Sequence, residues 1–76
     1  MPSAVIRRYA YRPGLAALDV EFRSGRIYRY REVPPEVAEE MRRWMSKGAF
    51  LNRKVRERFA FERLPEWPEE GEPLLA

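Results

Sequence analysis

Two short stretches of this chain combine positive charge with residue patterns that could bind nucleic acid. The first is residues 26–31, in which Tyr28 and Tyr30 alternate with arginines that include Arg29. Successive residues of a β-strand point to opposite faces, so a strand here presents rings on one face and charge on the other. Aromatic rings can stack on bases and cations can contact phosphates. The same alternation is also typical of an ordinary half-buried strand whose tyrosines pack in the core.

The second stretch is residues 53–58, which hold four cations and a single acid, Glu57. A helix in this region would bury Leu51, Val55 and Phe59, which recur at every fourth position. Its outer face is then strongly basic, which is typical either of a solvated helix face or of a surface that contacts phosphates. The predicted nucleic-acid-binding residues of the two stretches are Arg53, Lys54, Arg56, Arg58, Tyr28, Tyr30 and Arg29.

Residue types that usually perform catalysis are missing from the sequence. The chain has no cysteine and no histidine, which removes thiolate metal sites, the commonest zinc ligand and the commonest general base. Glu39 and Glu40 are adjacent on a predicted helix and diverge by about 100°, so they cannot share a substrate. We interpret them as surface partners of Arg42 and Arg43. The sequence therefore predicts a protein that is not an enzyme and has neither cofactor nor metal.

The charge of the chain is unevenly distributed. Residues 1–64 carry all 15 cations and 8 of the 12 acids, a net charge of +7, whereas residues 65–76 carry four glutamates and no cation. This asymmetry favours an anionic partner for the body of the protein, which we predict to be RNA or single-stranded DNA. No apolar run approaches the roughly 20 residues that cross a bilayer, and no signal peptide is visible, so we expect a cytoplasmic protein with no membrane partner.

Three strands are predicted, over residues 4–11, 18–22 and 26–31. A turn at Arg12-Pro13-Gly14 closes the first, with a positive φ at Gly14. The turn after Phe22 sets the register: a two-residue turn would place the tyrosines opposite the acids of the second strand. A three-residue loop with Gly25 in the left-handed conformation instead pairs Leu18 with Tyr30 and Val20 with Tyr28. We favour this register, in which the second strand has one buried face and Asp19 forms an exposed pair with Arg29.

Helical signals follow the third strand. The Pro34-Pro35-Glu36 segment is typical of a helix start, and an apolar stripe follows, consisting of Val37, Met41, Trp44 and Met45. Lys47-Gly48 predicts the end of this helix. A second short helix is expected within residues 49–58, capped or tied to the preceding loop by Asn52. Residues 59–64 are expected to form a last strand or an extended segment.

These elements predict an α+β fold: a small antiparallel β-meander of three strands, or four if residues 59–64 add one. One main helix and a short second helix pack on one face. The predicted domain covers residues 1–64. Residues 65–76, with three prolines and four acids, are expected to form an acidic, proline-rich, disordered tail.

Several motifs, taken in order, resemble the KTSC domain family. They are Leu18-x-Val-x-Phe22, Tyr28-x-Tyr30, Val33-Pro-Pro-Glu-Val37, Ser46-Lys-Gly48, Phe50-Leu-Asn52 and Val55-Arg56. The family is named for a segment at the C-terminus of some lysyl-tRNA synthetases and includes small stand-alone bacterial proteins. The resemblance covers roughly residues 3–64, with departures at Ala38, where an aromatic residue is common, and at Phe59 and Phe61, where tyrosine is usual.

The resemblance leaves two hypotheses for function. The synthetase context implies a small RNA-binding module, with RNA or tRNA favoured over single-stranded DNA. The alternative is an accessory domain that binds a protein partner and no nucleic acid, either through its aromatic surface or through Trp67 and Leu74-Leu75 of the tail.

Overall fold

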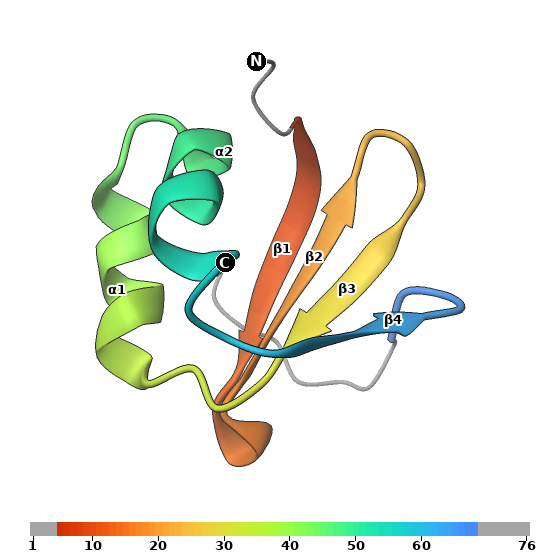
Figure 1. The fold of residues 1–76 in the computed structure, drawn as a ribbon, viewed down its shortest axis with the longest axis horizontal. Coiled ribbons are helices and arrows are strands. Elements are labelled where there is room, and N and C mark those ends of the chain that lie inside the picture. The colour runs from red at the N-terminus through yellow and green to blue at the C-terminus, as the bar shows by residue number, and fades with distance from the viewer. Residues whose placement is uncertain (1–4, 69–76) are drawn as a thin grey trace.

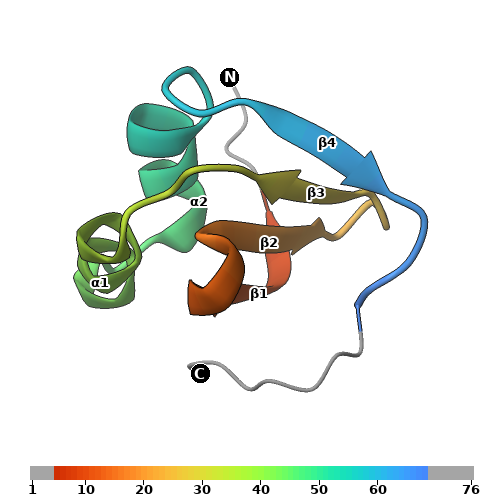
Figure 2. The same cartoon turned by 90° about the horizontal axis from the view of Figure 1, so that it is seen from below.

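The computed structural model describes residues 5–68, which form one four-stranded antiparallel sheet and a group of helices on one side of it (Figures 1 and 2). The strands are β1 (Ile6–Arg12), β2 (Ala17–Phe22), β3 (Ile27–Tyr30) and β4 (Phe61–Leu64), and they are neighbours in chain order. The helices are η1 (Pro13–Leu15), α1 (Pro35–Arg43), α2 (Lys47–Phe50) and the π-helical η2 (Leu51–Val55). The predicted α+β meander is confirmed, and residues 61–64 supply its fourth strand. Within the described residues, no helix has both the length and the apolar character needed to cross a membrane.

The register between β2 and β3 is the one that the three-residue loop predicts. Leu18 lies opposite Tyr30, and Val20 lies opposite Tyr28. The Phe22 amide donates to the Arg26 carbonyl at 2.9 Å, and Gly25 has a φ of +98°. Both tyrosines therefore lie on the sheet face that carries Leu18 and Val20.

The core lies between this face and the helices. The sheet contributes four buried side chains, Tyr11, Leu18, Val20 and Tyr30, and the helices contribute Val37, Ala38, Met41, Phe50, Leu51 and Val55. The Tyr11 hydroxyl donates to the Val33 carbonyl at 2.6 Å, which ties β1 to the chain just before α1. Burial, with a smaller contribution from Glu36, raises the pKa of this hydroxyl.

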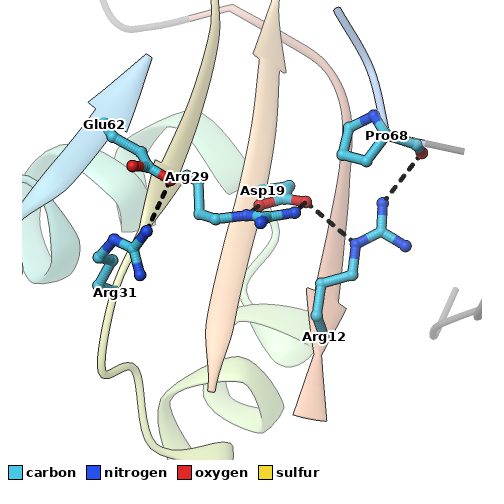
Figure 3. Close-up of polar contacts among 6 residues, drawn as sticks. All are labelled: Arg12, Asp19, Arg29, Arg31, Glu62 and Pro68. Atoms are coloured by element: carbon cyan, nitrogen blue, oxygen red, sulfur yellow. Dashed lines mark hydrogen bonds and ion pairs between the residues drawn. The ribbon is translucent and has the colours of Figure 1, made fainter. Parts of the chain in front are cut away.

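The opposite face of the sheet is also covered, which corrects the prediction of a single buried face. Residues 17–21 of β2 are all buried, and Asp19 is fully buried between two arginines (Figure 3). Arg12 Nε lies 3.0 Å from Asp19 Oδ2, and Arg29 Nε lies 2.8 Å from Asp19 Oδ1. The predicted exposed pair of Asp19 and Arg29 is therefore a buried network, because the arginine side chains lie along the sheet and shield the carboxylate.

Residues beyond β4 take part in this covering. The Arg8 guanidinium lies 4.3 Å from the centre of the Trp67 ring, and Arg12 Nη2 donates to the Pro68 carbonyl at 3.4 Å (Figure 3). β4 runs away from the helices, and the chain after it bends round toward the β1 side of the sheet (Figure 2). Residues 65–68 form neither helix nor strand, but Trp67 and Pro68 contact the domain rather than solvent alone. The disorder predicted for residues 69–76 lies outside the described residues.

The ends of the elements differ from the predictions in two places. At the first turn, Ala16 rather than Gly14 has a positive φ, +50°. The Ala16 amide donates to the carbonyl of Pro13, the first residue of η1, and this hydrogen bond ends the helix. Lys47 and Gly48 begin α2 instead of ending α1, because the Ser46 hydroxyl accepts from the Ala49 amide at 3.1 Å and caps the new helix.

Met45 also differs from its predicted place in the apolar stripe. The helix α1 ends at Arg43, so Met45 lies in the connection and is 93% exposed. Lys47 still stabilises the end of α1, as predicted, although it lies outside that helix. Its ammonium donates to the carbonyls of Arg42 and Trp44, at 3.1 and 2.7 Å, and so satisfies the C-terminal end of that helix.

Candidate nucleic-acid interface

The cations of residues 53–58 form an exposed surface, which we call the basic turn. Leu51 and Val55 are fully buried in the core, and this anchors η2 so that the positions between and after them point outward. The Arg56 amide donates to the Leu51 carbonyl, five residues earlier, at 2.9 Å. This π-helical bond ends the helix at Val55, so Arg56 and Arg58 lie in the turn beyond it rather than on a longer α-helix. Wide π-helical turns of this kind occur frequently at functional sites.

The three arginines of the basic turn keep their charge available. Arg56 Nη1 donates to the neutral Asn52 side chain at 3.0 Å, and the Arg58 guanidinium lies 5.2 Å from the centre of its neighbour's ring, Phe59. Arg53 forms no ion pair with any acid of residues 5–68. Neither role predicted for Asn52, capping the second helix or tying it to the loop after Gly48, is seen: Ser46 caps that helix, and the Asn52 carbonyl oxygen accepts from Arg56 one turn later.

Lys54 is the exception within the basic turn. Its ammonium lies 3.8 Å from Glu40 Oε2 and 6.0 Å from the centre of the Trp44 ring on the neighbouring helix. This contact diverts Glu40 from the predicted pairing with Arg43, while the predicted pair of Glu39 and Arg42 is present at 3.3 Å. Lys54 therefore connects η2 to α1 and offers less free charge than its neighbours.

Elsewhere several arginines are neutralised within the fold. Arg8 pairs with Glu21 at 2.6 Å, and Arg31 pairs with Glu62 at 2.7 Å. Arg29, a predicted binding residue, makes two contacts with the buried Asp19 and lies on the face of the sheet away from the helices (Figure 3). The structure thus does not bring Arg29 together with the basic turn.

The two predicted tyrosines differ in exposure. Tyr30 is 3% exposed, so its ring has no free face for a base and belongs to the core. Burial raises the pKa of its hydroxyl, and nearby Arg56 partly offsets this rise. Tyr28 is half-buried between Phe22 and Phe61, at ring-centre distances of 5.6 and 4.9 Å. Part of the Tyr28 ring is therefore accessible on the helix-facing side of the sheet, whereas Tyr30 is not accessible.

Two residues that the sequence reasoning did not select lie beside these tyrosines. Phe61 is 54% exposed and lies opposite Tyr30 on the edge strand β4, while the exposed Arg63 lies opposite Tyr28. The alternation of residues 59–64 is a local signal for a strand. This alternation does not indicate that the strand lies at the edge of the sheet, where the helices do not cover it.

The sequence comparisons bear on the whole of this arrangement. The model of the KTSC domain family matches residues 2–59. This chain belongs to the KTSC domain family. The match includes the basic turn and the first three strands, and it ends before β4.

Relatives of this KTSC domain are of two kinds. The chain is 38% identical to a lysine–tRNA ligase of Nostoc punctiforme over 61 residues, which are 80% of this chain and 11% of that protein. It is 40% identical over 52 residues to an uncharacterized protein of Stutzerimonas stutzeri, covering 68% of this chain and 73% of that one. A protein of Tsukamurella paurometabola is 39% identical over 57 residues, 85% of its length. The chain thus spans about a tenth of the ligases but most of the two small proteins.

Proposed function

We propose that this KTSC domain is a small, non-enzymatic RNA-binding module whose basic turn contacts the phosphate backbone. The observation that carries the proposal is the contrast among its cations. Arginines on the far face of the sheet are paired with carboxylates, whereas Arg53, Arg56 and Arg58 share one exposed turn without such partners among the described residues. Exposed guanidinium groups that have no carboxylate partner are suited to phosphate oxygens, which accept from arginine.

RNA is favoured over other anions because of the proteins in which related segments occur. Related segments occur in lysine–tRNA ligases of Nostoc punctiforme and a second Nostoc strain, enzymes whose name includes tRNA. A domain attached to such an enzyme, and also found as a small protein, is consistent with an accessory RNA-binding role. Phosphate contacts alone position a nucleic acid without reading its sequence, so we expect weak sequence preference.

The first test is binding of the purified protein to tRNA, single-stranded DNA and duplex DNA over a salt series, followed by fluorescence anisotropy. The logarithm of the association constant should fall linearly with the logarithm of the salt concentration, with a slope of about −0.7 per phosphate contact on a single strand. The double variant Arg53→Glu with Arg56→Glu should lose at least tenfold in affinity for tRNA at low salt and should show a shallower salt slope.

A variant of equal charge serves as the control. Arg23 and Arg26 are exposed at the β2–β3 turn, which lies on the opposite side of the molecule from η2 (Figures 1 and 2). Arg23→Glu with Arg26→Glu changes the net charge equally and should bind tRNA more tightly than the basic-turn variant. Equal losses in the two variants would mean that only net charge matters. No binding by the wild type at about 50 mM salt, where such contacts are strong, would contradict the proposal and favour a domain that binds a protein partner.

A further inference from the structure

The sheet face that packs on the helices is left partly open at its β4 edge. Phe61, Tyr30, Leu18 and Tyr11 lie opposite one another on successive strands, β4 to β1. Exposure along this row changes sharply, from 54% at Phe61 to 3% at Tyr30 and 0% at Leu18. The helices thus cover the inner strands and stop short of the ring at the edge.

The ring of Phe61 is held from one side by two other rings. Its centre lies 4.9 Å from that of Tyr28 and 5.6 Å from that of Tyr30, both in tilted arrangements. Tyr30 is itself immobilised in the core. An exposed aromatic side chain with such backing is already ordered before a ligand arrives, so little conformational entropy is lost on binding.

Charge around the ring favours an anionic ligand. The exposed Arg63 lies on the same face, opposite Tyr28, at a spacing that puts cross-strand side chains within about 5.5 Å at their Cβ atoms. Arg56 partly offsets the rise in the pKa of the Tyr30 hydroxyl, and the Tyr30 ring lies 5.6 Å from that of Phe61. The acid of β4, Glu62, points to the opposite face and pairs with Arg31. The open ring therefore lies beside the cation of Arg63, while the acid of its own strand lies on the opposite face.

We propose that Phe61, supported by Tyr28, is a stacking site for an unpaired nucleobase, and that Arg63 contacts the adjoining phosphate. The inference rests on the proposed RNA binding and adds the part of the ligand that the basic turn does not contact. Every base has an aromatic face, so such a site tolerates any sequence but requires an unpaired base. The domain then prefers single strands and loops to duplexes.

The main test uses Phe61→Leu, which retains an apolar side chain of similar size and removes the aromatic ring. For a single-stranded RNA oligonucleotide, this variant should bind roughly tenfold more weakly than the wild type. Its salt slope should be unchanged, since the phosphate contacts remain. For a strand of the same length whose central positions lack bases, the wild type and the variant should bind equally.

Two further variants check the interpretation. Leu15→Ala removes another exposed apolar side chain, 59% exposed in η1, and should leave RNA affinity unchanged. Phe61→Trp should retain binding, and its added fluorescence should be quenched when single-stranded RNA is bound, with a smaller effect for duplex RNA. Circular dichroism melting of each variant shows whether the fold is intact.

The outcomes separate this inference from the proposed function. If the wild type binds RNA with the expected salt slope but Phe61→Leu binds the intact strand equally well, the stacking site is wrong and the basic turn stands. If Phe61→Leu instead abolishes a self-association seen by analytical ultracentrifugation, with no change in RNA affinity, a second copy of this chain is the occupant. Failure of the wild type to bind any nucleic acid overturns both proposals.

Discussion

Asp19 is the residue on which the far face of the sheet depends. It is fully buried, and the Arg12 and Arg29 side chains that pair with it are only 9% and 17% exposed. Withdrawing a carboxylate from water is costly, but two guanidinium groups in contact with both of its oxygens offset much of that cost. Once such a network exists, removing its acid takes the compensating negative charge away from two guanidinium groups in a region of low dielectric constant.

We expect Asp19→Asn to lower the free energy of unfolding by about 3 kcal/mol, a large part of the stability of a domain this small. Urea denaturation followed by circular dichroism measures the change. The matched control is Glu62→Gln, which breaks the pair with Arg31, whose side chains are 43% and 52% exposed. That variant should lose less than about 1 kcal/mol, and similar losses for the two variants would contradict the view that burial sets the importance of a pair.

At the scale of the elements, the turn between β2 and β3 fixes which side chains share a face. Gly25 has a φ of +98°, and a Cβ added there would meet no atom within 4 Å. Any cost of a side chain at this position is therefore backbone strain and not a clash. Gly14 in η1 also has open space around it but lies outside the positive-φ region.

The two glycines make a matched pair of substitutions. Gly25→Ala should destabilise the protein by about 1–2 kcal/mol, because an L-residue resists the left-handed region. Gly14→Ala should stabilise it by about 0.5 kcal/mol, because alanine restricts the unfolded chain. Thermal melts of both variants measure the two changes, and a stabilising Gly25→Ala would show that the turn relaxes without cost.

Much of the meander could be predicted from sequence because its signals are local. The alternation of Leu18, Val20 and Phe22, with a glycine at the right distance, determines the register, since a slip by one residue would reverse the faces. The start of α1 follows from Pro35, which occupies its first position. The end of α1 was missed because Lys47-Gly48 has the composition of a helix end, whereas the cap of Ser46 turns the same residues into a helix start.

The remaining errors concern contacts between residues far apart in the chain. Burial of Asp19 depends on side chains from neighbouring strands, and the contact between Arg12 and Pro68 joins positions 56 residues apart. The same holds for the candidate site. The positive charge of the basic turn is evident from six consecutive residues. The burial of Tyr30 and the exposure of Phe61 instead depend on how far the helices extend across the sheet.

At the scale of the whole molecule, Trp67 and Pro68 after β4 contact the arginines of β1. Trp67 is half-buried, and its ring lies 4.3 Å from the Arg8 guanidinium and 5.7 Å from that of Arg12. Contacts between a cation and an aromatic face contribute about 0.5–2 kcal/mol, depending on how far water is excluded. This is a measurable part of the stability of a chain of 76 residues.

We therefore expect Trp67→Ala to lower the free energy of unfolding by about 1–2 kcal/mol, which for a domain of this size lowers the melting temperature by several degrees. Truncation after Leu64 should have at least as large an effect, whereas truncation after Pro68 retains the described contacts and serves as the control. Calorimetry of the three proteins measures this, and an unchanged melting temperature after removal of residues 65–76 would mean that the contact adds no stability.

The position of β4 in the chain affects where the protein unfolds locally. The pairs of β1 with β2 and of β2 with β3 close short turns, whereas β4 meets β3 across positions 30 and 61, with α1, α2 and η2 between them. Pairing β4 with β3 closes the longest loop between paired strands and so has the largest entropic cost of loop closure. Because β4 also lies at the sheet edge with one neighbour, we expect it to be the first strand to unfold locally. Phe61 and Trp67 are only six residues apart in the chain. Local unfolding of β4 would therefore remove Phe61 from one face of the sheet and would also release Trp67 from the arginines on the other face. We therefore expect local opening of this four-residue strand to uncover both faces of the sheet together.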